Sequence, residues 1–401
     1  MSLSTHGFSV PFQFPVSFTR GVWRQGNPVF VQTIRSLEPD RRHRVLVVVD
    51  DRVALTHPSL LDEIEEYFAT FATALELVAP PVLVPGGETV KNDLSHCFTI
   101  LQQINEAGLD RQSFVAVIGG GAVLDMVSFA AAIAHRGIRT VRLPSTVLSQ
   151  ADSGIAVKNG LNLFGKKNFI GAFVPPFAVI NDLEFLESLE PRDKIAGMAE
   201  VIKVSLLRDT ALFDYLESHA VEIARGDSDV RAAVVQRSAD LHVAHICGNG
   251  DPFELGSARP LDFGHWAAHK LEIMSRHRLR HGEAVAIGMA LDLTYAALVG
   301  YLGRHTLDRV LRLLDALGLP SWDEALFERD PEGRFSVLQG LQEFREHLGG
   351  ELHVTLVRKV GESFEVTEMD ETVICRAIES LALRAADPAA DAALAVAHAL
   401  Q

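Results

Sequence analysis

Hydrophobic residues in the first part of the chain gather in short runs, and the segments between these runs have helical spacing. Three runs are rich in β-branched residues and end in acidic or small residues, as buried parallel strands do: "HRVLVVVDDRV" (43–53), "SFVAVIGGG" (113–121) and "RTVRLPST" (139–146). Helical spacing fills residues 60–75, 94–108 and 122–137. This alternation predicts a doubly wound, Rossmann-like parallel sheet with a ligand site at the carboxyl ends of its strands.

The pattern changes after about residue 186, where stretches such as "DKIAGMAEVIKVSLL" and "GEAVAIGMALDLTYAALVG" space their apolar residues as helices do. Because 401 residues exceed a single ordinary core, the sequence predicts two domains. These are an α/β domain over residues 1–185 and a mostly α-helical domain over residues 186–401. The alanine-rich tail after about residue 383 is expected to be a loose helix or disordered.

Composition narrows the range of partners. The formal charge of −15 argues against a nucleic-acid or anionic-membrane partner, so an anionic substrate needs a local basic pocket. No apolar run is long enough for a membrane span, and the first residues have neither the basic nor the apolar region of a signal peptide. The cysteines (Cys97, Cys247 and Cys375) are few and far apart, which favours a reducing, cytoplasmic location.

Glycines and an acidic residue in the expected sheet lie where a nucleotide could bind. Gly119, Gly120 and Gly121 join a strand to a helix, where backbone N–H groups either approach a phosphate or form only a tight turn. Their spacing is not the usual dinucleotide fingerprint. Asp50 ends the first strong strand and either holds a ribose hydroxyl or caps the next element.

A basic, glycine-rich segment follows at residues 153–173, "SGIAVKNGLNLFGKKNFIGAF". Lys158, Lys166, Lys167 and Asn168 stand there among small residues, either as a solvated basic loop or as an anion pocket. The apolar residues around them favour the pocket.

Ionisable residues in apolar surroundings mark the second domain. Glu200 and Lys203 lie three apart on one helical face, and the apolar stretch around them favours buried charges over a surface ion pair. His265, His269 and His281 lie within 17 residues of one another. Two histidines and one carboxylate are typical of a catalytic zinc site with an open position. The spacing alone does not tell which histidines bind.

Taken together, several motifs resemble those of the 3-dehydroquinate synthase superfamily, the sugar-phosphate cyclases. In chain order they are "PGGETVK", "GGGAVLDMVSFAAAIAHRG", "LPSTVLSQADSGIAVKNGLN", "GKKNFIGAF", "AEVIK", "FGH…H" and "HGEAVAIGM", covering about residues 45–290. The resemblance implies an NAD-binding α/β domain, a helical metal-binding domain and an active site between them. It also implies NAD, a divalent metal (usually zinc, with cobalt as an alternative), a small phosphorylated sugar as substrate, and a homodimer.

The reaction that the resemblance implies is a phosphate-eliminating carbon–oxygen lyase reaction. A ring hydroxyl is transiently oxidised, phosphate is eliminated, the ketone is reduced again, and an aldol step closes a carbocycle without net redox change.

The resemblance also implies roles for individual residues. Glu200, His265 and His281 fall on metal-ligand positions, and His269 falls on a substrate or phosphate contact. Other catalytic or substrate positions are matched by Asp152, Lys158, Lys167, Asn168, Lys203, Glu254 and Asp262, with Arg136 reaching the substrate phosphate across a dimer. The dinucleotide site is matched by Asp50, Glu88, Lys91, Gly119, Gly120, Gly121, Asp125, Ser145 and Thr146, together with Lys158 and Lys167.

The sequence departs from dehydroquinate synthase proper where the substrate carboxylate would be held. Asp262 replaces an asparagine, Ala258 an arginine, and Ala244, flanked by His242 and His245, a lysine, while "EFREHLGGELHVTL" replaces a double-lysine segment. An added aspartate repels a carboxylate but accepts hydrogen bonds from hydroxyls. The sequence therefore predicts a heptulose 7-phosphate without a carboxylate, as in the 2-epi-5-epi-valiolone synthases.

Three alternatives stay open. The first is 3-dehydroquinate synthase itself with a rearranged carboxylate site. The second is a metal-dependent polyol or alcohol dehydrogenase, against which the lysines of "KNGLNLFGKKN" and Arg136 argue, because a polyol needs no phosphate clamp. The third is a catalytically inactive binding protein, against which the histidine and carboxylate set argues.

Overall fold

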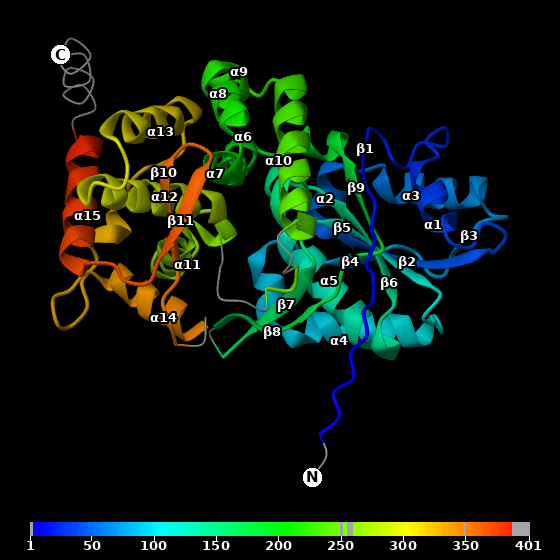
Figure 1. Ribbon diagram of the computed structural model, residues 1–401. Coiled ribbons are helices and arrows are strands. Elements are labelled where there is room, and N and C mark those ends of the chain that lie inside the picture. Colours follow the sequence, from blue (N-terminus) through cyan, green and yellow to red (C-terminus); the bar gives the residue numbers. More distant parts are fainter. Residues whose placement is uncertain (1–2, 165, 249–251, 255–259, 348–349, 387–401) are drawn as a thin grey trace. The chain divides into compact units, whose positions relative to one another are not determined.

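The computed structural model describes residues 3–164, 166–248, 252–254, 260–347 and 350–386 (Figure 1). The chain divides into two compact units, unit 1 with residues Met1–Ser145 and Gly154–Ser188, and unit 2 with residues Thr146–Ser153 and Leu189–Gln401. Unit 1 ends close to the boundary expected at residue 185, but Thr146–Ser153 groups with unit 2, which the hydrophobic pattern does not reveal. Among the described residues, no helix has the length and apolarity for crossing a membrane.

Unit 1 is built on a parallel sheet. Its elements in chain order are β1 (Val16–Thr19), α1 (Val29–Arg35), β2 (His43–Asp50), α2 (Asp51–Thr56), α3 (Leu60–Thr70), β3 (Leu75–Leu77), β4 (Val82–Val84), η1 (Glu88–Asn92), α4 (Leu94–Glu106), β5 (Phe114–Gly119), α5 (Gly121–Ile133), η2 (Ala134–Arg136), β6 (Arg139–Pro144), β7 (Lys158–Leu163), β8 (Lys166–Phe173), β9 (Ala178–Asp182) and η4 (Leu183–Leu186). The strand order is β1-β9-β6-β5-β2-β3, with β4 also paired to β2, and the paired strands run parallel. The predicted doubly wound sheet is confirmed.

The central strands are apolar throughout because both faces of the sheet are covered. On β2, Val45, Val47 and Val49 pack with aromatic residues of the segment that includes α1 and α3, whereas Leu46 and Val48 pack with residues of α4 and α5. Successive side chains of a strand point to opposite faces, so a strand buried on both sides has no polar alternation. This is the reason that the run at residues 43–53 is so nearly continuous.

The glycine-rich basic segment forms an antiparallel hairpin rather than a loop. β7 pairs with β8 in a register that sets Lys158 opposite Phe173 and Gly160 opposite Gly171. A Cβ at Gly160 would lie 2.7 Å from the Ile170 carbonyl oxygen, so the close approach of the two strands requires glycine there. Gly160 and Gly171 are therefore needed for the packing of the two strands.

Unit 2 is mostly helical, as predicted. Its elements are η3 (Ser149–Ser153), α6 (Pro191–Ala196), α7 (Met198–Arg208), α8 (Thr210–Ser218), α9 (Ala220–Ala224), α10 (Ser228–Gly248), η5 (Pro260–Asp262), α11 (His265–Met274), α12 (His281–Leu298), α13 (Arg304–Leu317), η6 (Glu324–Phe327), η7 (Ser336–Leu338), α14 (Gln339–His347), β10 (Val354–Lys359), β11 (Glu362–Val366) and α15 (Glu371–Ala386). The β10–β11 hairpin was not expected from the sequence. The tail expected to be loose lies, from residue 387 on, outside the described residues.

Helix α12 is the central element of unit 2. Apart from Glu283, every residue from Gly282 to Ala296 is buried, so the helix is apolar on all sides, as a helix enclosed by others must be. Two glycines of α12 allow the backbone of neighbouring segments to come close to the helix. A Cβ at Gly282 would lie 1.8 Å from the Ala196 carbonyl oxygen, and one at Gly288 would lie 2.0 Å from the Gly264 carbonyl oxygen.

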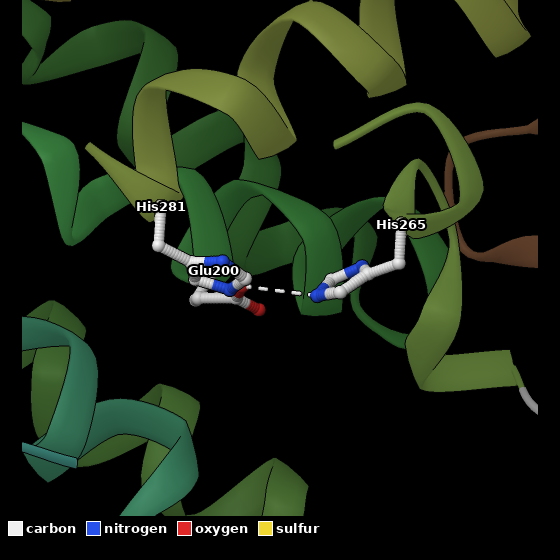
Figure 2. Close-up of side chains that lie close together, drawn as sticks. All are labelled: Glu200, His265 and His281. Carbon is white, nitrogen blue, oxygen red and sulfur yellow. Dashed lines mark ion pairs between the residues drawn. The ribbon is translucent and has the colours of Figure 1, made fainter. Parts of the chain in front are cut away.

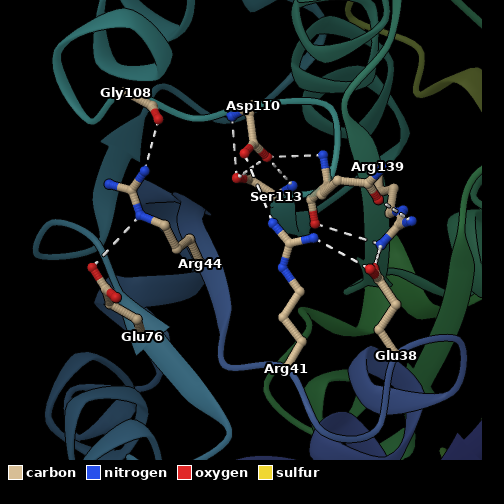
Figure 3. Close-up of polar contacts among 9 residues, drawn as sticks. Glu38, Arg41, Arg44, Glu76, Gly108, Asp110, Ser113 and Arg139 are labelled. Carbon is tan, nitrogen blue, oxygen red and sulfur yellow. Dashed lines mark hydrogen bonds and ion pairs between the residues drawn. The ribbon is translucent and has the colours of Figure 1, made fainter.

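A network of polar side chains lies at the amino-terminal ends of the central strands of unit 1 (Figure 3). Arg139, at the start of β6, donates to the Glu38 carboxylate at 2.9 Å, and Arg41 donates to its other oxygen at 3.2 Å. Asp110 accepts bonds from the Ser113 amide at 2.9 Å and the Ser113 hydroxyl at 2.8 Å. The hydrogen bond from Arg139, helped by Arg41, lowers the pKa of Glu38.

This network predicts a pH-dependent contribution to stability. A carboxyl whose pKa is lowered by folding stabilises the folded state while it is ionised, and the contribution is lost as the pH falls from the ordinary value of 4.5 through the lowered one. We expect Glu38→Gln to reduce the free energy of unfolding at about pH 7 and to have a smaller effect at about pH 3. Urea unfolding at both pH values measures the difference. Glu65→Gln, on the exposed side of α3, is the control. A reduction independent of pH would contradict the assignment.

Candidate functional site

Three potential metal ligands meet inside unit 2, each from a different helix (Figure 2). They are Glu200 on α7, His265 as the first residue of α11 and His281 as the first residue of α12, with one ligand atom of each within 4.8 Å of the others. Glu200 Oε1 lies 3.6 Å from His265 Nε2 and 3.5 Å from His281 Nε2. Two atoms bound tetrahedrally to one zinc ion stand about 3.4 Å apart. The spacing therefore suits a shared ion.

The other nitrogen of each imidazole is engaged on the far side of the ring. His265 Nδ1 lies 3.0 Å from the Phe263 carbonyl oxygen, and His281 Nδ1 lies 3.2 Å from Glu272 Oε2. Since a carbonyl oxygen only accepts, His265 Nδ1 carries the proton and Nε2 keeps its lone pair. Outer partners of this kind fix the tautomer and the orientation of metal-binding histidines.

The protonation states also fit a metal. Burial and the nearby charge of Lys203 lower the pKa of His265 to about 4, so the ring is neutral at pH 7. Burial alone would raise the pKa of Glu200, but Lys203, His281 and His265 together lower it to about 2, so the carboxylate is ionised. Glu200 is 1% exposed, and neither of its carboxylate oxygens has a hydrogen bond of normal geometry. A divalent cation would satisfy this buried carboxylate.

Lys203 stands at the centre of the surrounding charges. It forms an ion pair with Glu200 one turn before it on α7, and both side chains are buried. Burial alone would lower the pKa of Lys203, but the carboxylates of Asp152 and Glu200 raise it, and Asp262 adds to the effect. Lys203 is therefore a charged group in a site where three carboxylates act on it.

His269 lies beside the two other histidines. Its ring centroid is 5.4 Å from that of His265 and 6.1 Å from that of His281. It is partly exposed, and its atoms do not join the group of close ligand atoms formed by Glu200, His265 and His281. The four-residue spacing of His265 and His269 leaves open which of them could bind a metal ion. The structure places His265 Nε2 3.6 Å from Glu200 Oε1.

A second ion pair borders this cluster. His242 Nδ1, on α10, lies 2.8 Å from Asp152 Oδ1, on η3. Burial would raise the pKa of Asp152, but Lys203 and His242 together hold it well below its usual range. His245, which follows Ala244 on α10, contacts Arg208 at 3.0 Å, and burial with that guanidinium lowers its pKa to about 4.

Other predicted positions in this part of the chain are only partly described. Glu254 has a positive φ of 50° and is half-buried, and its charge acts on His245. Ala258 lies outside the described residues, as do residues 348–349 of the "EFREHLGGELHVTL" segment.

The predicted polar residues of unit 1 form a cluster of their own. Lys91 Nζ contacts Asp125 Oδ2 at 2.6 Å and Asn168 Oδ1 at 2.5 Å. Lys167 Nζ lies 3.9 Å from Glu88 Oε1, which also accepts a bond from Asn162 at 3.1 Å. These contacts join η1, α5 and the β7–β8 hairpin around Lys91, which is 4% exposed.

The glycine turn and Asp50 lie together at the carboxyl ends of β2 and β5. A Cβ at Gly119 would lie 2.9 Å from Val123 and 3.2 Å from the Asp50 Cβ, and a Cβ at Gly86 would lie 2.2 Å from Asp50 Oδ1. Asp50 caps α2 by accepting a bond from the Arg52 amide at 2.9 Å. Gly120 is the N-cap of α5, with Gly121 its first residue. Ser145 donates its amide proton to the Gly119 carbonyl, 2.9 Å away.

Three further predicted positions have distinct surroundings. Arg136 is exposed and follows His135 in a turn where both have positive φ, 63° and 52° respectively, which is costly for residues with a side chain. Lys158 is exposed at the start of β7. Thr146 Oγ1 lies 2.8 Å from Ser149 Oγ in unit 2.

Three buried polar residues around these sites were missed by the sequence analysis. Glu272 contacts His281, Asp292 contacts both neighbours of His265, and Arg142 donates to the carbonyl oxygens of Ala156 and Lys158 before and at β7. A signal existed for two of them. Asp292 is the one carboxylate in "AVAIGMALDLTYAAL", and Arg142 interrupts the apolar strand "RTVRLP".

Comparison with known proteins agrees with this arrangement. Residues 81–196 match the family described as 3-dehydroquinate synthase N-terminal, and residues 197–335 match 3-dehydroquinate synthase C-terminal. A 3-dehydroquinate synthase of Halorhodospira halophila is 35% identical over 73% of this chain and 83% of its own. A 2-epi-5-epi-valiolone synthase of Streptomyces glaucescens is 36% identical over 69% of this chain and 70% of its own.

A solved structure extends the likeness to nearly the whole chain. ValA, the 2-epi-5-epi-valiolone synthase of Streptomyces hygroscopicus, solved with NAD⁺ and Zn²⁺ bound, is 26% identical, with a TM-score of 0.83 over 95% of this chain and all of its own. The chain therefore belongs to the 3-dehydroquinate synthase family. It is an enzyme of the sugar-phosphate cyclase class, whose members are carbon–oxygen lyases that eliminate phosphate.

Proposed function

We propose that this enzyme is an NAD- and metal-dependent cyclase whose substrate is a heptulose 7-phosphate without a carboxylate. The observation that carries the substrate assignment is the carboxylate of Asp262, whose charge acts on the buried ammonium of Lys203. A substrate carboxylate brought into this field would be repelled, whereas sugar hydroxyls can donate to the same oxygens. Lys203 and His242 lower the pKa of Asp152 most strongly, and His242 contacts it directly at 2.8 Å.

Glu200, His265 and His281 are the proposed metal ligands, and zinc is the metal expected. Two imidazoles and a carboxylate form a donor set typical of catalytic zinc and leave a position for a substrate oxygen. His281 is 30% exposed, so the cluster is reachable from solvent. When bound, the metal supplies a Lewis acid for a substrate hydroxyl, and NAD⁺ supplies a hydride acceptor.

The chain's own residues then orient the substrate and move protons. Lys203 holds its proton because of the surrounding carboxylates and can donate hydrogen bonds to a substrate oxygen. His269, next to the ligand histidines, is proposed to contact the substrate or its phosphate. Lys158, Lys167, Asn168 and Arg136 are proposed to stabilise the departing phosphate, since charged donors bind phosphate strongly.

The dinucleotide is proposed to bind along the carboxyl ends of the strands of unit 1. The residues proposed for it are Asp50, Glu88, Lys91, Gly119, Gly120, Gly121, Asp125, Ser145 and Thr146, with Lys158 and Lys167. Glycines between β5 and α5 leave the first N–H groups of the helix open to a phosphate, and the helix dipole favours the negative charge. The assembly is proposed to be a homodimer in which Arg136 serves the neighbouring subunit.

Removal of a proposed ligand is expected to abolish metal loading. For Glu200→Ala and His265→Ala, we expect metal affinity to fall by more than the roughly 10- to 100-fold typical of losing an outer partner, with turnover lost in parallel. The metal content after dialysis measures the first effect, and the rate of phosphate release measures the second. His305→Ala, at an exposed position of α13, is the matched control and should leave both unchanged. Full activity of a metal-free variant would sink the ligand assignment.

Substrate preference is tested by offering two sugar phosphates in parallel. With NAD⁺ and Zn²⁺, we expect the enzyme to release phosphate from sedoheptulose 7-phosphate and not from 3-deoxy-arabino-heptulosonate 7-phosphate, because only the second carries a carboxylate. Release from the carboxylate substrate alone would instead assign the enzyme as 3-dehydroquinate synthase. Accumulation of NADH without phosphate release would assign it as a dehydrogenase.

Asp262→Asn isolates the role of the added carboxylate. The variant is expected to lower kcat/KM for the neutral sugar phosphate by about 10-fold, because a hydrogen bond to a charged group contributes roughly 1.5 kcal/mol. Asp240→Asn, on the exposed side of α10, is the control. Steady-state kinetics with sedoheptulose 7-phosphate make the comparison, and unchanged constants would remove the basis of the substrate argument.

A further inference from the structure

Asp292 is a buried carboxylate with a specific pair of partners. It lies in the second half of α12, is 0% exposed and stands between Leu291 and Leu293, which are also fully buried. Within the described part of the chain it forms no ion pair. A charged group in such surroundings is costly, and burial raises the pKa of Asp292 to about 7, while the two hydrogen bonds that it accepts oppose this rise.

Both of these bonds come from residues next to His265. Asp292 Oδ2 accepts from the Gly264 amide at 3.0 Å, and Asp292 Oδ1 accepts from Trp266 Nε1 at 2.8 Å. The carboxylate therefore holds the chain on each side of the histidine. Trp266 is 2% exposed, so its indole is fixed by packing as well as by this bond.

The backbone at Gly264 packs closely against the backbone of α12. Gly264 has a φ of 78°, which favours glycine, and a Cβ there would lie 2.8 Å from the Met289 amide nitrogen. The Gly264 carbonyl oxygen in turn lies against Gly288 of α12. The start of α11 is thus pressed onto one turn of α12, and Asp292, one turn further along, anchors it there.

The direction of the His265 ring follows from this anchoring. Its Nδ1 bonds the Phe263 carbonyl oxygen, which belongs to the same turn, and its Nε2 then lies 3.6 Å from Glu200 Oε1. A rotation or shift of the Gly264–Trp266 segment would move Nε2 away from Glu200 and from His281.

We propose that Asp292 is a positioning residue for the metal centre, and that it holds His265 in its ligand position through Gly264 and Trp266. The inference rests on the proposed function, because it takes His265 as a metal ligand. The hydrogen bonds that Asp292 accepts come from the two neighbours of His265 and not from the side chain of a proposed metal ligand. Its effect is therefore expected on metal affinity and coordination geometry rather than on the substrate.

The test compares Asp292→Asn with the wild type by loading the full-length, metal-free protein with Zn²⁺ or Co²⁺. An asparagine has nearly the same shape, but its single oxygen can accept only one of the two bonds well. We expect the dissociation constant for Zn²⁺, measured by competition with a chromophoric chelator, to rise about 10- to 100-fold, as for loss of other outer partners. We also expect the visible absorption bands of the Co²⁺ form, which report its coordination geometry, to change.

A matched variant on the same helix separates positioning from general destabilisation. Thr294 is buried, two residues beyond Asp292, and its hydroxyl bonds the Ala290 carbonyl within α12. Thr294→Val is expected to leave the Zn²⁺ dissociation constant within about 2-fold and the Co²⁺ spectrum unchanged, since the bond that it loses lies within α12. Urea unfolding of the metal-free variants shows whether the two substitutions cost similar stability.

Trp266→Phe keeps the proposal testable if Asp292→Asn does not fold. It removes one donor and keeps the aromatic ring, so a rise of about 3- to 10-fold in the Zn²⁺ dissociation constant is expected.

The outcomes distinguish this proposal from the proposed function. If Asp292→Asn and Trp266→Phe bind Zn²⁺ as the wild type does, with the same Co²⁺ spectrum, while His265→Ala loses the metal, the positioning role is refuted and the metal site stands. If the wild type and His265→Ala bind Zn²⁺ equally weakly, the metal site itself is refuted, and the role of Asp292 with it.

Discussion

Burial of the Glu200 carboxylate is the constraint on which the rest of unit 2 depends. A carboxylate that is 1% exposed must be held by positive charge or donors, and Lys203 provides the ion pair from the same helix. The oxygen that faces away from Lys203 faces two imidazoles, each brought there as the first residue of a helix. The packing of α7, α11 and α12 thus gathers two imidazoles and an ammonium around one buried negative charge.

Unit 1 gathers its polar residues in a different way, beside a parallel sheet rather than among packed helices. Its sheet is covered on both faces, so most of the polar residues described above lie at strand ends, in turns and on the β7–β8 hairpin. Lys91 illustrates the consequence, because it is buried but compensated by Asp125 and Asn168 from two other elements. Glycines at Gly119 and Gly86 leave the space that Asp50 occupies.

The sequence predicted the alternation in unit 1 and the helices of unit 2 because both rest on local hydrophobic periodicity, which is visible without tertiary contacts. It also gathered the histidines and Glu200 as a set, since ionisable residues in apolar helices need partners. The spacing alone could not choose between His265 and His269, because four residues place both on one helical face, and it was the family resemblance that assigned His265 to a ligand position. In the structure, His265 stands at the very start of α11, after the left-handed Gly264, with its Nε2 3.6 Å from Glu200 Oε1. The β7–β8 hairpin and the grouping of Thr146–Ser153 with unit 2 depend on long-range packing, which the local pattern does not contain.

Helix α12 carries His281 at its first residue and, through Gly288 and Asp292, the anchor of the segment that bears His265. The two imidazoles therefore share one rigid support, although they come from different helices. The separation of the two imidazoles is thus set by α12 and the segment packed on it, whereas their distance to Glu200 is set by the packing of α12 against α7. If the histidines bind one metal ion as proposed, a change in the packing of these helices would alter the distance to the carboxylate more than the distance between the two nitrogen atoms.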